Sequence, residues 1–128
     1  MTHSHESHRR TAFDVTVVSP LAVAVVSRSA REAGAATADA VEKKLGKYKA
    51  MGDCDYSPFA IDTYGGLHET AVEVIRFIAR RQCDFSTTPL SFSFVFSRIL
   101  QRLSLSLQRS NAQALLRSDP RVACVGRI

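Results

Sequence analysis

Two short apolar runs separated by a long segment of helical periodicity constrain this sequence more than any other feature. Residues 13–18 (FDVTVV) are rich in β-branched side chains and stop before Pro20, because proline fixes φ and removes a backbone donor. Residues 57–64 (SPFAIDTY) form a second run of this kind, which ends at a glycine pair. The two runs therefore predict two buried strands.

The segment between these strands has the spacing of a helix. Residues 29–51 are rich in alanine, and Gly34 and Gly46 weaken the predicted helix without interrupting its pattern. A strand, a long helix and a second strand, in this order, predict a parallel pair with a right-handed crossover. The side chains that repeat at helical spacing are Ala30, Ala33, Thr37, Val41, Lys44, Tyr48 and Met51.

Two further helices are expected after the second strand. An apolar stripe from Ala71 to Ile78 predicts a helix that ends near Arg81, and residues 91–117 keep helical spacing after a polar linker, although their serines allow a break. The predicted fold is therefore of the α/β class, with a short parallel β-α-β core, a long crossover helix and two further helices. Two parallel strands alone make a poor sheet, because parallel sheets normally have several strands. The chain is therefore expected to lack edge strands that would precede residue 13.

Length and composition predict one small domain. The chain has 128 residues, of which 45% are hydrophobic and 23% charged, as in a globular protein. The expected organisation is a flexible lead-in over residues 1–11, an α/β domain over residues 12–117 and a tail over residues 118–128.

The sequence also excludes several classes of protein. Its three cysteines, Cys54, Cys83 and Cys124, are far apart and form no CxxC pair, so we expect free thiols in a reducing compartment. The N-terminal residues lack the apolar core of a secretory signal, and the longest apolar run is too short to span a membrane. An intracellular protein without a membrane partner is expected.

The charge balance indicates an acidic partner. A net charge of +5 favours an acidic partner such as nucleic acid. The alternative is that these basic side chains form only the solvated face that any soluble helix requires. The candidate nucleic-acid-binding residues are Lys43, Lys47 and Lys49 on the crossover helix, and Arg98, Arg102 and Arg109 on one face of the last helix.

Asp14 and Lys44 are the candidate catalytic pair. A carboxylate inside an apolar strand needs a cation, a metal or several donors, and Lys44 lies within the apolar stripe of the crossover helix. A β-α-β unit can bring both to one end of the sheet, where Asp14 would bind Mg²⁺ and Lys44 would steady the attacking water or the phosphate. Spacing alone favours the alternative, in which Asp14 meets solvent at a strand end and the lysine extends its charge into water.

Asp62 is the candidate second acidic ligand. It precedes the Thr63-Tyr64-Gly65-Gly66 step, which could receive an anion at a helix N-terminus. The commoner alternative is a tight turn in which the glycines adopt positive φ.

Four segments taken together resemble a known family. They are AFDVTVVSPL, AGAATADAVEKKLGKYKAM, FAIDTYGG and RLSLSLQRSNAQALLRS, in this order. They resemble the restriction-like endonuclease region, of the PD-(D/E)XK type, that follows reverse transcriptase in some non-LTR retrotransposon polyproteins. The resemblance covers residues 9–117. It implies that the strand aspartate, here Asp14, is a metal ligand, and that the helix lysine, here Lys44, is catalytic.

The sequence has further matches to the family pattern and two departures from it. Lys47 and Tyr48 complete the family's K-x-x-K-Y motif, which adds Lys47 to the expected catalytic residues, and Asp62 falls on an acidic position before the T-Y-G step. The family's upstream strand, with its first acidic ligand, has no counterpart, and Thr16 replaces the second acidic residue. The resemblance therefore implies a metal-dependent DNA-nicking domain in the nucleus or its inactive remnant. The alternatives are a non-catalytic nucleic-acid-binding or interaction module and a translated fragment without function.

Overall fold

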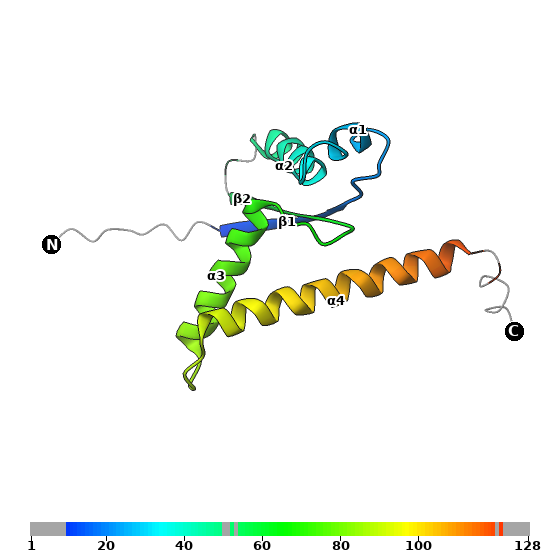
Figure 1. The fold of residues 1–128 in the computed structure, drawn as a ribbon. Helices are drawn as coiled ribbons and strands as arrows, with labels where there is room; N and C mark the ends of the chain where they lie inside the picture. The colour runs from blue at the N-terminus through cyan, green and yellow to red at the C-terminus, as the bar shows by residue number, and fades with distance from the viewer. Residues whose placement is uncertain (1–9, 50–51, 53, 120, 122–128) are drawn as a thin grey trace, which may run out of the picture. The chain divides into compact units, whose positions relative to one another are not determined.

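The computed structural model describes residues 10–49, 52, 54–119 and 121, in the order β1, α1, α2, β2, α3, α4 (Figure 1). The chain divides into two compact units, Met1–Val74 and Ile75–Ile128, so that the first turns of α3 belong to the first unit and the rest of α3, with α4, to the second. The predicted mixed α/β class is confirmed.

The first unit is built on a parallel pair of strands. β1 (Arg10–Val18) pairs with β2 (Cys54–Asp62), in a register that runs from Arg10 opposite Cys54 to Val18 opposite Asp62. The parallel pairing is as predicted, but each strand begins about three residues earlier than the apolar runs indicated. Backbone pairing begins before the first apolar side chain, so Arg10 and Thr11, which were expected in the lead-in, lie in β1.

The predicted helix over residues 29–51 is wrong as a single helix. The chain instead forms a short α1 (Val26–Ser29) and a separate α2 (Ala35–Tyr48). Gly34 stands between them with a φ of 79°, a left-handed conformation that interrupts an α-helix and that glycine adopts without steric cost. The Thr37 hydroxyl donates a hydrogen bond to the Gly34 carbonyl at 2.9 Å and ties the first turn of α2 to this residue.

Small side chains let α2 lie close to one face of the strand pair. Ala40 and Val41 of α2 and Ala60 of β2 are buried together, with Val18 of β1 packed against them. Alanine carries little side-chain bulk, so the helix axis can approach the sheet, and the apolar area removed from water stabilises the crossover. In Figure 1, α2 lies over the two strands and connects them.

The start of α3 (Glu69–Phe85) is held to β2 by hydrogen bonds. The Thr70 amide donates to Nδ1 of His68 at 3.2 Å, and the Thr70 hydroxyl donates to the Pro58 carbonyl at 2.8 Å. Side-chain acceptors at a helix start satisfy backbone amides that have no partner within the helix. The helix continues four residues beyond the predicted end at Arg81, into the predicted linker.

The second unit contains the longest helix of the chain. α4 (Phe92–Ser118) runs for 27 residues without the break that its serines allowed, close to the predicted range (Figure 1). Val95 is buried, the Phe92 and Phe96 rings lie 5.7 Å apart, and the Arg80 guanidinium of α3 lies 5.8 Å from the Phe92 ring. The ring contact lies within α4, and the cation–π contact joins α3 to α4.

The expectations about a membrane span and about the cysteines can be compared with the structure. No helix in the residues that the structure describes is long and apolar enough to cross a membrane. Cys54 and Cys83, which were expected to be free thiols, are free, and both are half-buried; Cys124 lies outside the described residues.

The core between α2 and the sheet generates the first prediction. Val41→Ala should lower the free energy of unfolding by about 1–2 kcal/mol, because Val41 is buried and removal of its methyl groups leaves a cavity. Val23→Ala is the matched control and should change it by less than about 0.5 kcal/mol, because Val23 is 95% exposed. Urea denaturation measures both, and equal effects would contradict the assignment of Val41 to the core.

Candidate functional site

Asp14 lies in the middle of β1 on the face that α2 covers. Side chains of a strand alternate between its two faces, so Asp14 shares its face with Thr16 and Val18, and Val18 packs against the core of α2. In the parallel register Asp14 stands opposite Pro58. Its side chain is 23% exposed, so the carboxylate is neither fully buried nor surrounded by water.

Two side chains of α2 converge on this carboxylate. The Lys44 ammonium lies 2.8 Å from Oδ2 of Asp14, and the Tyr48 hydroxyl donates a hydrogen bond of 2.6 Å to the same oxygen. Lys44 and Tyr48 are four residues apart and therefore project from one side of the helix. The Tyr48 ring stacks on the Tyr56 ring of β2, with 4.4 Å between centroids and 4° between planes. We call Asp14, Lys44, Tyr48 and Tyr56 the Asp14 cluster.

The contacts within the Asp14 cluster shift the pKa values of its members. Hydrogen bonds from Lys44 and then from Tyr48 lower the pKa of the Asp14 carboxyl below its usual value of 3.8. The bond to Asp14 raises the pKa of the Lys44 ammonium and that of the Tyr48 hydroxyl above their usual values. Each shift favours the form that makes the contact, so the cluster holds a charged pair beside a neutral tyrosine at neutral pH.

The other predicted lysines surround the Asp14 cluster in different ways. Lys47 has its ammonium 5.7 Å from the centre of the Tyr48 ring, and its charge contributes to the lowered pKa of Asp14. Lys43 forms a 2.8 Å ion pair with Asp39, one turn earlier on α2. Within the described ranges, Lys47 and Lys49 are exposed and have no carboxylate partner. These two lysines are therefore the most available to an external anion.

The structure does not bring Asp62 to Asp14. Asp62 pairs with Val18, four residues further along the sheet, which is about 13 Å at the rise of a strand. Its Oδ1 accepts hydrogen bonds from the amides of Tyr64 at 2.8 Å and Gly66 at 2.9 Å. Gly65 has a φ of 94°, so this segment is the tight turn that was the alternative interpretation of Asp62.

The donor set at Asp14 offers a metal ion one protein carboxylate. No group of three or more metal-binding His, Cys, Asp or Glu side chains occurs in the part of the chain that the structure describes. Mg²⁺ is often held by one or two carboxylates together with substrate phosphates, so Asp14 fits as a single ligand only when a phosphodiester supplies further oxygens. Asp62 is too far away to share that ion with Asp14.

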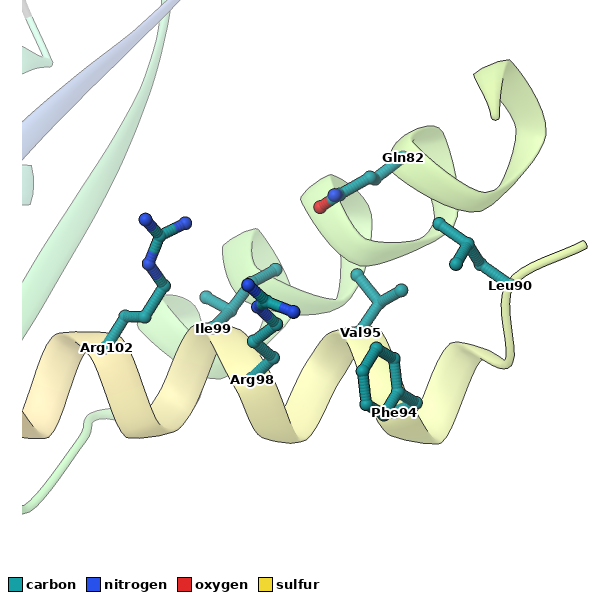
Figure 2. Close-up of a pocket in the computed structure, with 7 residues that line it drawn as sticks. All are labelled: Gln82, Leu90, Phe94, Val95, Arg98, Ile99 and Arg102. Atoms are coloured by element: carbon teal, nitrogen blue, oxygen red, sulfur yellow. The ribbon is translucent and has the colours of Figure 1, made fainter. Parts of the chain in front are cut away.

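Two of the predicted arginines lie together in the second unit. Arg98 and Arg102 project from α4 beside a cavity of about 310 Å³ between α3 and α4, with Val95 and Ile99 along its apolar side (Figure 2). Arg109, two turns further along α4, does not line the cavity. Its lining residues are Gln82, Leu90, Phe94, Val95, Arg98, Ile99 and Arg102.

Sequence reasoning missed the roles of two tyrosines. Tyr48 was assigned to the helical stripe and to a sequence motif, without a contact to Asp14; its hydroxyl is the second donor to Asp14, and its ring stacks on Tyr56. The position of Tyr48, four residues after Lys44, was the available signal, because both side chains then share a helix face. Nothing in the sequence pattern indicated Tyr56, whose place opposite Tyr48 depends on the strand register.

Comparison with known proteins does not assign a family. No protein-family model, curated protein or solved structure matches this chain.

The hydrogen bond from Tyr48 generates the second prediction. Tyr48→Phe keeps the stacked ring but removes a donor to Asp14, so the pKa of Asp14 should rise towards 3.8 while Lys44 still holds it below that value. A lowered folded-state pKa stabilises the protein above the unfolded pKa, and this stability is lost as pH falls through the folded value. In Tyr48→Phe this contribution should therefore be smaller, and its loss, which begins at the unfolded-state pKa in both proteins, should be complete at a higher pH.

A carboxyl NMR titration of Asp14, together with urea denaturation between pH 5 and pH 2, measures both effects. Tyr64→Phe is the matched control, because the Tyr64 side chain is 73% exposed, and it should leave the titration unchanged. An unaltered Asp14 titration in Tyr48→Phe would show that the hydroxyl does not stabilise the carboxylate.

Proposed function

We propose that this chain is a retrotransposon-derived, restriction-like endonuclease domain that nicks DNA with Mg²⁺ in the nucleus, using Asp14 and Lys44. The contact between Lys44 Nζ and Asp14 Oδ2, at 2.8 Å, is the observation that carries the proposal. The resemblance implies that a strand carboxylate and a helix lysine act at one point, and Asp14 and Lys44 come from separate elements of a β-α-β unit. The kinship itself rests on the sequence motifs.

Three residues of the Asp14 cluster, together with the neighbouring Lys47, have defined parts in the proposed reaction. A magnesium ion bound by Asp14 and the DNA would polarise the scissile phosphate. Lys44 would neutralise charge on the phosphate or orient the attacking water, and its raised pKa keeps it protonated for that purpose. Tyr48 holds the carboxylate in place by a 2.6 Å hydrogen bond. Lys47, beside the Tyr48 ring, adds a second cation for the DNA backbone.

The third prediction concerns nicking. Asp14→Asn should lower the rate of supercoiled-plasmid nicking with Mg²⁺ or Mn²⁺ by at least about a hundredfold, because the amide keeps the shape of the side chain but loses the charge that binds a metal. Lys44→Ala should have a similar effect. Asp39→Asn is the matched control and should retain activity, because Asp39 pairs with Lys43 and not with Lys44.

Circular dichroism of each variant should confirm that it is folded before the rates are compared. Full activity in Asp14→Asn would refute the ligand role, and equal losses in Asp14→Asn and Asp39→Asn would indicate a general effect of charge. Nicking that is absent from the folded wild-type chain would favour the second candidate function.

The second candidate is a module that binds nucleic acid without cleaving it. The position of Asp62 favours this function. Of the two carboxylates that were expected to bind a metal ion, Asp14 and Asp62, only Asp14 lies at the site. In addition, Lys44 and Tyr48 both contact the same oxygen of Asp14, so the carboxylate is already neutralised by the protein. Binding would then depend on Lys47 of α2 and Lys49 directly after it, and on Arg98, Arg102 and Arg109 of α4.

The fourth prediction tests binding separately from cleavage. In a fluorescence-anisotropy titration of duplex DNA at several salt concentrations, the double variant Lys47→Ala, Lys49→Ala should reduce the slope of log affinity against log salt by about two, one for each lysine that no longer neutralises a phosphate. Arg31→Ala removes a positive charge outside α2 and should leave the slope unchanged. An unchanged slope in the lysine variant would exclude this face of α2 from the DNA interface.

A further inference from the structure

The outer edge of β1 pairs with no strand among the described residues. In the described residues the sheet has two strands, and β1 uses one of its edges to pair with β2. The outer edge of β2 is partly covered, because the chain turns back after Asp62, and the Asp62 amide bonds to the Gly66 carbonyl while the His68 amide bonds to the Ala60 carbonyl. No comparable segment among the described residues pairs with the outer edge of β1. Its backbone therefore presents unused donors and acceptors on one side.

The identity of the outward-facing backbone groups follows from one hydrogen bond. The Val18 carbonyl accepts a 2.9 Å bond from the Thr63 amide on the β2 side. The backbone groups of alternate residues point to the same side of a strand. The amides and carbonyls of the even-numbered residues of β1 therefore point towards β2. The amides and carbonyls of Thr11, Phe13, Val15 and Val17 therefore point outward.

The three apolar residues of this set also have exposed side chains. Phe13, Val15 and Val17 are 49%, 65% and 53% exposed, and they form a stripe on the face of β1 opposite to α2. Soluble proteins usually protect an open edge with lysine, proline or an unpaired charge. β1 has no lysine or proline, and its central charge, Asp14, is paired with Lys44. The edge is thus suited to a further strand.

We propose that β1 pairs with β1 of a second copy of this chain, antiparallel, about a two-fold axis through Val15. The two strand pairs then form a continuous four-stranded sheet with β1 and its copy at the centre. Three cross-strand pairs, Val15 with Val15 and Phe13 with Val17 in both directions, contribute about six backbone hydrogen bonds. Sheets with three or more strands and a shared apolar face are much more stable than isolated pairs.

Backbone geometry and charge select this register over its neighbours. An axis between two residues would oppose outward-facing groups with groups that face β2, so the axis must pass through a residue. An axis at Asp14 places the two carboxylates opposite each other, which like charge disfavours. An axis at Phe13 leaves Val17 without a partner in β1, and one at Thr16 puts Phe13 opposite Ser19. Only the axis at Val15 pairs all three exposed apolar side chains with one another.

A buried hydroxyl provides independent support for the same register. The Thr16 Oγ1 atom is inaccessible to solvent and has no hydrogen-bond partner among the described residues, which is costly for a buried polar group. With the axis at Val15, Thr16 lies opposite Asp14 of the second copy, in a pair whose Cα atoms approach to about 4.5 Å. Rotation about χ1 then lets the hydroxyl donate to that carboxylate. Association would thus satisfy a donor that the described residues of the single chain leave without a partner.

Sedimentation velocity with matched variants tests the proposal. The wild-type chain should sediment as a dimer at tens of micromolar. Val15→Lys and Val15→Glu should each sediment as monomers, because each places two like charges on the axis, and an equimolar mixture should restore the dimer. The fold should be retained, because Val15 is already 65% exposed. Val23→Lys, at a residue 95% exposed outside β1, should leave the dimer intact.

Amide hydrogen exchange provides a second readout that does not depend on any substitution. When the protein concentration is raised from the monomer range to the dimer range, the amides of Phe13, Val15 and Val17 should exchange at least tenfold more slowly. The exchange rate of the Val23 amide should not change. A monomeric wild-type chain at 100 micromolar or a dimer that persists in Val15→Lys would overturn the proposal. Open-ended assemblies would overturn it equally, because a two-fold axis closes after two copies.

Discussion

Parallel pairing of β1 with β2 is the constraint on which the rest of the first unit depends. Strands that run in the same direction cannot be joined by a tight turn, so the connecting chain must cross one face of the pair. Gly34 ends the preceding turn, α2 begins, and small side chains such as Ala40 and Ala60 let the helix approach the sheet. That approach brings Lys44 and Tyr48 to Asp14, which is 34 residues away from Tyr48 in the sequence.

The Asp14 cluster contains a conflict between stability and chemistry. Lys44 and Tyr48 keep the Asp14 carboxylate charged in a half-buried position, and this lowers its pKa. The same contacts neutralise the negative charge that would attract a metal ion, and Asp62 is engaged in its own turn. A phosphodiester that drew Lys44 towards its own oxygens would release Asp14 for a metal. The proposed nicking activity therefore requires that DNA replace part of the ion pair.

The sequence predicted the helices and strands well, and it predicted contacts between residues far apart in the chain less well. Runs of β-branched and apolar side chains located the two strands, and helical spacing located α3 and α4, because these patterns reflect the geometry of each element. The break at Gly34 was missed, because a single glycine in an alanine-rich segment does not show whether its φ is positive. Asp14 and Lys44 could be paired in advance from the β-α-β order. The distance of Asp62 and the contact of Tyr56 depend on the strand register, which no local pattern encodes.

Alternation within β1 separates the two properties proposed for this strand. The even-numbered residues Asp14, Thr16 and Val18 face α2, and their backbone groups point to β2. The odd-numbered residues Phe13, Val15 and Val17 are exposed, and their backbone groups point away from β2. Successive side chains of a strand point to opposite faces, so a substitution on one face leaves the side chains of the other face untouched. Self-association and the chemistry of Asp14 thus use different faces of one strand and meet only where Thr16 of one copy reaches Asp14 of the next.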